Sequence, residues 1–188
     1  SKIKVDYQTK QMSSLVNLGK LLVVMDKIDL KNQNVAIKTI ELNDTKAGVT
    51  FAKPQSVKKA VVKAVKKLDT LVTSPGADKG WRATIAKVSF ANDDSKYDNN
   101  ATAPIAKGLD FGHMHISDLQ VDMENLAYNP DSIAGRINTL TFAEKGGLRI
   151  NKFHTSFLYG PKNSYLNDLY LETPQTVLQK RLQVSYPS

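Results

Sequence analysis

The chain has 188 residues, of which 41% are hydrophobic, so it can bury a sizeable core as one domain or two small ones. Its net charge of +8 favours an anionic partner such as phospholipid headgroups, but its arginines are too few and too scattered to predict a nucleic-acid surface. The absence of cysteine excludes disulfides, thiolate nucleophiles and cysteine-ligated metal sites. The longest apolar run, residues 21–25, is far shorter than the roughly 20 residues that a membrane-spanning helix needs.

The first part of the chain is predicted to be mostly strand. Apolar and polar residues alternate in residues 1–14 as in an edge strand, whereas residues 15–25 fit either one face of a helix or a buried strand. From residue 28 to 51 we expect short strands joined by turns at 31–34 and 43–48, because Asn and Gly accept turn conformations that other residues resist.

The apolar period then changes to that of an α-helix over about residues 54–73. Val and Ala recur every three or four residues, lysines occupy the opposite face, and Ser74-Pro75-Gly76 ends the segment. A basic amphipathic helix can lie on an anionic membrane, but an apolar face without Trp or Phe favours packing against a sheet, as a cover for its end or edge.

The strand pattern resumes at residues 81–90 and is followed by a predicted polar loop at 92–103. Residues 109–186 are predicted to be nearly continuous short strands. The predicted turns, which combine Gly, Pro or Asn, lie at 129–132, 144–147 and 160–163.

One spacing recurs seven times: a large apolar residue, two others, an apolar residue, one other and an apolar residue. The copies are Met25/Ile28/Leu30, Ile37/Ile40/Leu42, Ile85/Val88/Phe90, Ile116/Leu119/Val121, Met123/Leu126/Tyr128, Ile137/Leu140/Phe142 and Leu166/Leu169/Leu171. When no large apolar residue is allowed in between, chance gives about two copies, whereas all but the last pass this test. The final two-residue step keeps two side chains on one face of a strand, but the three-residue step does not, so we expect a bulge or bend there.

These patterns predict a mainly β fold: an antiparallel meander curled into an open groove or half-barrel, with one amphipathic α-helix at about 54–73. Residues 1–188 are expected to form one unit, which can be subdivided into strands at 1–53, helix and linker at 54–80, and strands at 81–188. Both ends look cut, so we interpret the chain as a fragment of a longer protein. A closed β-sandwich is the alternative.

Few residues suggest chemistry. His113 and His115 would share one face of a strand, with Asp110 and Asp118 nearby, and two His and a carboxylate can bind zinc; a solvated polar face is the favoured interpretation. The acidic residues of 92–99 lack the spacing of a calcium loop. No nucleophile elbow, phosphate-binding loop or dinucleotide fingerprint is present. We therefore predict a protein that is not an enzyme and has no metal or cofactor.

Several stretches resemble the TamB proteins of Bacteroidetes, which belong to the AsmA-like group. They are Trp81 with Ile85-x-x-Val88-x-Phe90, Gly108-Leu109-Asp110-Phe111-x-His113, Asp131-Ser132-Ile133-x-Gly135-x-Ile137 and, most closely, the segment from Tyr165 to Pro174. The resemblance covers about residues 75–180 well and implies a section of a large envelope protein. Such proteins are anchored in the inner membrane, extend through the periplasm as a long β-groove with an apolar interior, and serve outer-membrane biogenesis.

The sequence therefore predicts a non-enzymatic groove that binds phospholipid acyl chains or the strands of outer-membrane proteins. The predicted groove residues are Ile28, Leu30, Ile40, Leu42, Val88, Phe90, Leu119, Val121, Leu126, Tyr128, Leu140, Phe142, Leu169 and Leu171. Expected partners are phospholipid or another acyl-chain ligand, outer-membrane assembly proteins and an anionic membrane surface, with no nucleic acid. The alternative function is that of a closed structural or adhesive domain on the cell surface, without a ligand.

Overall fold

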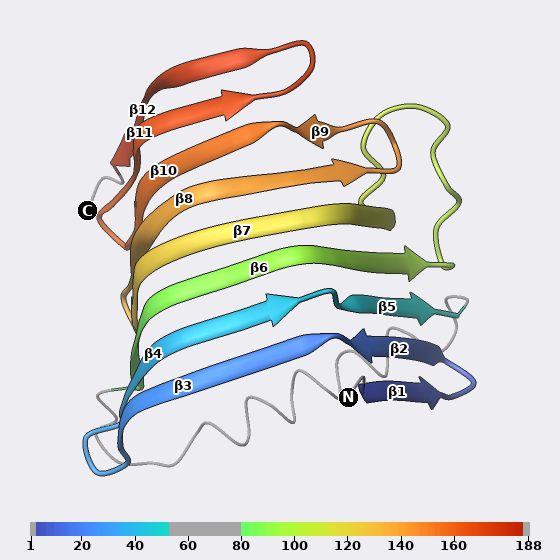
Figure 1. Ribbon diagram of the computed structural model, residues 1–188. Coiled ribbons are helices and arrows are strands. Elements are labelled where there is room, and N and C mark those ends of the chain that lie inside the picture. Colours follow the sequence, from blue (N-terminus) through green and yellow to red (C-terminus); the bar gives the residue numbers. More distant parts are fainter. Residues whose placement is uncertain (1–2, 53–79, 186–188) are drawn as a thin grey trace.

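The computed structural model describes residues 3–52 and 80–185, and all of the described strands belong to one sheet (Figure 1). In chain order the strands are β1 (Ile3–Gln8), β2 (Met12–Leu18), β3 (Lys20–Asp29), β4 (Asn34–Asn43), β5 (Lys46–Phe51), β6 (Arg82–Asn99), β7 (His113–Asn129), β8 (Ser132–Glu144), β9 (Arg149–Ile150), β10 (Lys152–Tyr159), β11 (Asn163–Glu172) and β12 (Val177–Ser185). The predicted turns near residues 31, 130, 145 and 161 are confirmed, because each joins two paired antiparallel strands.

The 18-residue strand β6 organises the sheet. On one flank its first half pairs in parallel with β4 and its second half with β5. Strand β3 extends the sheet beyond β4, and β2 and β1 extend it beyond β5. On the other flank β7 pairs antiparallel with β6, and the sheet continues through β8, β10, β11 and β12. The path does not close on itself, so β1, β3 and β12 are edge strands.

The mainly β part of the predicted fold class is confirmed, and the sheet is open, as predicted. The fold class as a whole is wrong, because no helix occurs in the described residues and the sheet is not an antiparallel meander. The long connection over residues 52–81 brings the chain back to the end of the sheet where β4 begins, so β6 runs parallel to β4 and β5. Residues 54–73, for which a helix is predicted, lie outside the described residues.

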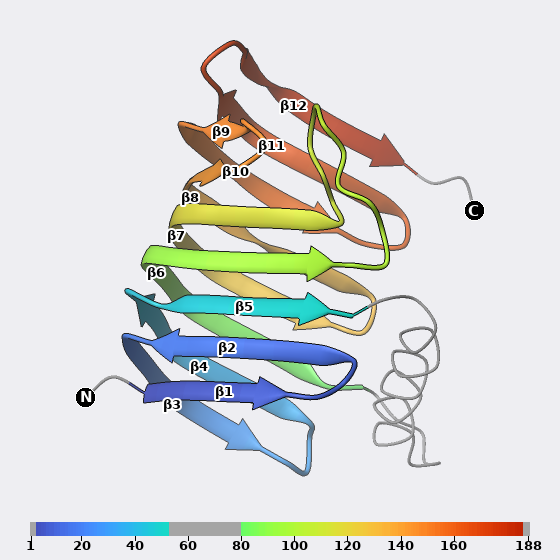
Figure 2. The same ribbon diagram turned by 90° about the vertical axis from the view of Figure 1, so that its right-hand side faces the viewer.

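The sheet bends along a line that crosses β2/β3, β4/β5, β6 and β7 (Figures 1 and 2). Asp44, Asn92 and Asp118 lie on this line with φ values of 55°, 58° and 54°. Asp and Asn accept this left-handed conformation more readily than other residues with a side chain. The predicted turn at 43–48 is therefore wrong, and the predicted loop at 92–103 is correct only from residue 100: the polar residues mark a bend, after which each strand continues in the same direction.

Polar contacts hold the bend. The backbone N–H of Thr45 donates to Oδ1 of Asp93 at 2.7 Å, and Nδ2 of Asn92 donates to Oδ1 of Asp44 at 2.6 Å. The N–H of Gly19 donates to Oγ1 of Thr45 at 3.3 Å. Asp93 is buried, and this burial raises the pKa of its carboxyl above the ordinary value. These contacts link the β2/β3 junction, the β4/β5 junction and β6 to one another at the bend.

The three-residue step of the recurring spacing coincides with bulges. In six of the seven copies the pairing register shifts within this step. Asp118, Asn125 and Asp168, all with positive φ, stand directly before the middle apolar residue of their copies. The remaining copy, Ile85/Val88/Phe90, lies on β6, and its pairing register stays constant with both neighbouring strands, β4 and β7. The extra residue restores the alternation, so all three apolar side chains of a copy share one face.

Candidate functional site

Apolar side chains form rows that run across the strands on one face of the sheet. The central row consists of Val23, Ile40, Val88, Met123 and Ile137, each of which is the direct register partner of the next. Directly opposed residues of neighbouring strands have Cβ atoms about 5 Å apart, so their side chains are in contact. Val88, at the centre of this row, is only 6% exposed.

A second row lies nearer the bend and contains Leu21, Leu42, Phe90, Val121 and Leu140, again as successive register partners. It crosses the same five strands as the central row. Two apolar residues of each of these strands thus lie side by side on the same face.

A third row lies on the other side of the central row and reaches further. It begins with Met25, Ile37, Ile85 and Leu126. It continues across Gly135 to Phe157, Leu166 and Leu182 on the last strands. A Cβ atom at Gly135 would lie 2.6 Å from Leu126 and 3.3 Å from Phe157, so the glycine lets these two side chains approach across β8. We call the three rows together the apolar band.

The apolar band runs across the strands from one edge of the sheet to the other. It crosses β3, β4, β6, β7, β8, β10, β11 and β12, so at about 4.8 Å per strand spacing it is roughly 34 Å long. No second sheet covers it among the described residues, since every described strand belongs to the same sheet. The band is both the main apolar contact surface of the fold and a surface that can receive a ligand.

The predicted groove residues divide into three groups. Ile40, Leu42, Val88, Phe90, Val121, Leu126 and Leu140 lie in the rows of the apolar band, and Leu169 and Leu171 lie beside them on β11. Leu119 and Phe142 lie at the bend, where Leu119 pairs with Asp93 and Phe142 pairs with Ile150. Ile28, Leu30 and Tyr128 lie at the ends of their strands, outside the band. The first residues of six triads also lie in the band but are not among the predicted residues, because the three-residue step had seemed to place them on the opposite face: Met25, Ile37, Ile85, Met123, Ile137 and Leu166.

The opposite face is polar on β4, β6, β7 and β8, whereas β3 has apolar residues on both faces. Lys20 pairs with Glu41 at 2.7 Å across β3 and β4, and Lys87 lies 3.9 Å from Asp122 across β6 and β7. Surface pairs of this kind contribute at most about 1 kcal/mol each. The charged pairs show that this face is suited to water, whereas the face with the apolar band is not.

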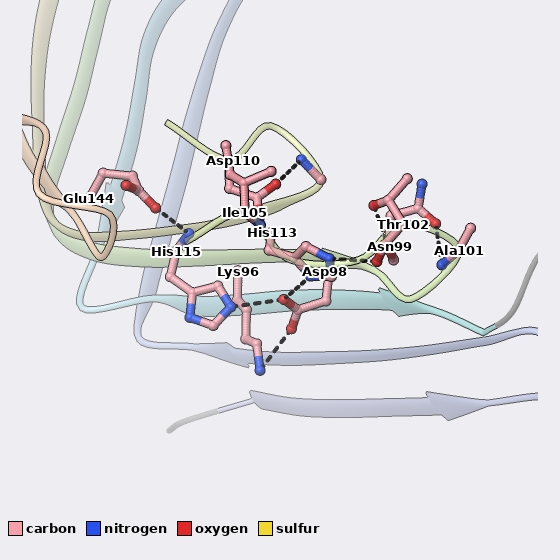
Figure 3. Close-up of polar contacts among 11 residues, drawn as sticks. Lys96, Asp98, Asn99, Ala101, Thr102, Ile105, Asp110, His113, His115 and Glu144 are labelled. Carbon is pink, nitrogen blue, oxygen red and sulfur yellow. Dashed lines mark hydrogen bonds and ion pairs between the residues drawn. The ribbon is translucent and has the colours of Figure 1, made fainter. Parts of the chain in front are cut away.

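A polar cluster lies on β6 and β7 on the far side of the bend (Figure 3). Oδ1 of Asp98 lies 3.0 Å from Nε2 of His115 and 3.4 Å from Nδ1 of His113, and Oδ2 lies 2.9 Å from Nζ of Lys96. Burial alone would raise the pKa of Asp98, but hydrogen bonds with Lys96, His115 and His113 lower it to about 2. The contact of Nε2 with the carbonyl of Thr102 at 3.0 Å raises the pKa of His113.

This arrangement does not favour the zinc interpretation. Asp110 accepts hydrogen bonds from the N–H groups of Ile105 and Gly112 within its own loop, and Asp118 lies at the bend. Within residues 3–52 and 80–185, no group of three or more His, Asp or Glu residues could hold a metal ion. The polar cluster instead fastens the 100–112 loop to the strands that it connects.

A hollow of about 980 Å³ adjoins this cluster on the part of the sheet that contains β1, β2 and β5. Its lysines include Lys46 and Lys96, which pair with Asp94 and Asp98 at 2.7 Å and 2.9 Å. Because these pairs neutralise Lys46 and Lys96, and Glu144 lines the hollow together with Lys145, the hollow provides no concentrated positive charge for an anion. It is separate from the apolar band.

Replacement of Asp98 by Asn is expected to lower the free energy of unfolding by about 2 kcal/mol at pH 7. The pKa of Asp98 is lowered in the folded protein from 3.8 to about 2, so its contribution is complete above pH 3.8 and is lost as the pH falls towards 2. Urea denaturation at pH 7 and between pH 5 and 2 measures this loss. Asp131→Asn, on an exposed turn, is the control. A difference from wild type that stays constant down to pH 2 would contradict the assigned role.

Comparison with known proteins does not identify the chain: no protein-family profile matches it, and neither does any curated protein sequence. The described residues also contain no helix long and apolar enough to cross a membrane.

Proposed function

We propose that the chain is a non-enzymatic section of a TamB-like envelope protein and that its apolar band binds the acyl chains of phospholipids. The continuity of the band is the observation that carries this proposal. Apolar side chains follow one another across eight strands, and a solvent-facing apolar surface of this extent is costly unless it has a partner.

The dimensions suit an acyl chain. The hydrocarbon core of a bilayer is about 30 Å thick, so a chain in one leaflet spans about 15 Å. The apolar band, roughly 34 Å long by its strand spacings, exceeds this length. The band runs perpendicular to the strands, which is the direction in which a groove would carry a lipid from one section to the next.

The proposed setting follows from the resemblance to TamB proteins. The protein would be anchored in the inner membrane, with this section in the periplasm between the two membranes, where it would act in outer-membrane biogenesis. The basic net charge of +8 is suited to anionic headgroups, which would remain in water beside a bound acyl chain.

A photo-crosslinking experiment tests the proposal. Benzoylphenylalanine at Phe90, in the apolar band, is expected to form an adduct with phospholipid during expression in bacteria, detected by mass spectrometry of the purified protein. The same residue at Tyr170 is the matched control, because Tyr170 stacks on His154 at a ring distance of 5.5 Å on the polar face. Equal adducts at both positions, or none at Phe90, would argue against an acyl-binding band.

A second candidate function is the binding of an outer-membrane protein strand, and the β3 edge favours it. Residues 21–25 of this edge strand are exposed, uncharged and apolar on both faces, whereas the β12 edge carries Lys180 and Arg181, charges that oppose pairing with another strand. An extended segment can add to such an edge through backbone hydrogen bonds. Val24→Lys, on the face of β3 opposite to the apolar band, should abolish strand binding and leave lipid crosslinking at Phe90 intact.

A further inference from the structure

A row of exposed apolar residues lies at one end of the strands, beyond the apolar band. Tyr128, Ile133 and Tyr159 are successive register partners on β7, β8 and β10. Tyr128 is also the partner of Ala83, which continues the row to Val35 and Ile28 on β4 and β3. The two tyrosines and the two isoleucines are all exposed, and Tyr159 is 64% exposed.

Two further residues extend this surface beyond the strand ends. Leu30 follows β3 and is 72% exposed, and Trp81 precedes β6 and is 43% exposed. The turns beside these residues all lie at the same rim, on the left in Figure 1, because β3, β7 and β10 end where β4, β6, β8 and β11 begin. We call Ile28, Leu30, Trp81, Tyr128, Ile133 and Tyr159 the aromatic rim.

Basic residues accompany the aromatic rim. Lys31, Arg82 and Lys162 are exposed at this end of the sheet, and none has an ion-pair partner among the described residues. Lys27 lies 3.8 Å from Asp29, and Asp131 is the other acidic residue of these turns. Among the described residues, the rim is therefore net positive.

We propose that the aromatic rim docks on the interface of an anionic lipid bilayer. Trp and Tyr are enriched at this depth of a membrane because their rings are apolar and their N–H and O–H groups remain hydrated. Lysine and arginine beside them are attracted to anionic headgroups. The combination of exposed rings, aliphatic side chains and unpaired basic groups along one rim matches both requirements.

The position of the rim gives docking a use. The row of Tyr128 and Ile133 lies directly beside the third row of the apolar band on the same face. A docked rim would place the third row of the band, along its length, next to the bilayer. Membrane docking does not depend on acyl binding; only the transfer of lipid from the bilayer to the band rests on the proposed function.

The single tryptophan makes the test direct. The wild-type chain is mixed with phosphatidylcholine vesicles that contain or lack phosphatidylglycerol, and binding is followed by sedimentation and by the emission of Trp81. We expect binding to the anionic vesicles with a blue shift of the emission, and quenching when the lipids carry brominated acyl chains. Sedimentation without a change in Trp81 emission, or no sedimentation, would overturn the proposal.

Variants separate the aromatic rim from general stickiness. The double variant Tyr128→Ser/Tyr159→Ser should bind anionic vesicles at least about tenfold more weakly, and Lys162→Glu about fivefold more weakly. Phe111→Ser is the matched control: Phe111 is 73% exposed but lies in the loop at the opposite rim. Circular dichroism verifies that the variants fold. If the double variant does not fold, Lys162→Glu still tests the rim.

An equal loss in Phe111→Ser would overturn the assignment of this rim. The result is also distinguishable from a failure of the proposed function. A chain that docks on vesicles but forms no lipid adduct at Phe90 keeps the membrane surface and loses the acyl-binding band. A chain that forms the adduct but does not dock keeps the acyl-binding band and loses the membrane surface.

Discussion

Val88→Asp is expected to lower the free energy of unfolding by at least about 4 kcal/mol, because the variant buries a carboxylate without a partner. Val88 is 6% exposed and has apolar register partners on both sides, Ile40 and Met123. Urea denaturation followed by circular dichroism measures the change. Thr84→Asp is the control, since Thr84 lies on the same strand but is exposed, between Ala36 and Ala127.

The outcome decides how a single sheet of this kind is stabilised. A large loss for Val88→Asp with a small one for Thr84→Asp would identify the apolar band as the core of the fold. A loss below about 1 kcal/mol at Val88 would mean that the band contributes little to folding. In that case its apolar character would need an explanation other than stability.

Gly19→Ala is expected to destabilise the protein by about 3 kcal/mol, because the added methyl group would overlap backbone atoms at the bend. A Cβ atom at Gly19 would meet the carbonyl oxygens of Asn43 and Asp44, which cannot move without disturbing the junction of β4 and β5. Thermal or urea denaturation provides the measurement.

The matched control for this variant is Gly48→Ala on β5. A Cβ atom there would lie 3.5 Å from Cβ of Lys96, an ordinary contact, so the variant should be as stable as wild type or slightly more so. Equal effects of the two substitutions would show that the close approach at Gly19 does not constrain the bend.

The local pattern of the sheet was predictable from the sequence. The two-residue steps of the recurring triads place pairs such as Val88 and Phe90 on one face, and the structure brings this pair beside Ile40 and Leu42 of β4. Alternation is a local property of a strand, so it can be read without knowing which strands pair. The turn at Asn129 was predictable for the same reason, since its residues act within the turn.

The long-range features were not predictable in this way. The parallel pairing of β4 and β5 with β6 joins residues separated by about 48 positions, and no local pattern reports such a pairing. Asp44 and Asn92 were misinterpreted as turn and loop residues because the residues that favour turns also favour bulges inside a strand. An Asp or Asn directly before the middle residue of a triad, as in Ser117-Asp118-Leu119, is a signal of a bulge inside a strand, but Asp44 and Asn92 do not stand in such a position.

The aromatic rim was also missed, for a physical reason. Tyr128 and Tyr159 are far apart in sequence and become neighbours only through Ile133, so their alignment depends on the registers of two strand pairs. Tyr128 appeared among the predicted residues as the end of a triad beside the predicted turn at 129–132, but nothing in its neighbourhood indicates which residues of other strands lie next to it.

The placement of β6 has a consequence for the order in which the chain folds. Strands β4 and β5 form hydrogen bonds with β6 on one flank, while β7 occupies its other flank. A chain emerging from the ribosome therefore holds its first five strands with one side unpaired until residue 99 has been synthesised. We expect the pairing of β4 and β5 with β6, which joins positions of high sequence separation, to be the slow step of folding. A nascent chain arrested before β6 should be a preferred substrate of chaperones that shield unpaired strands.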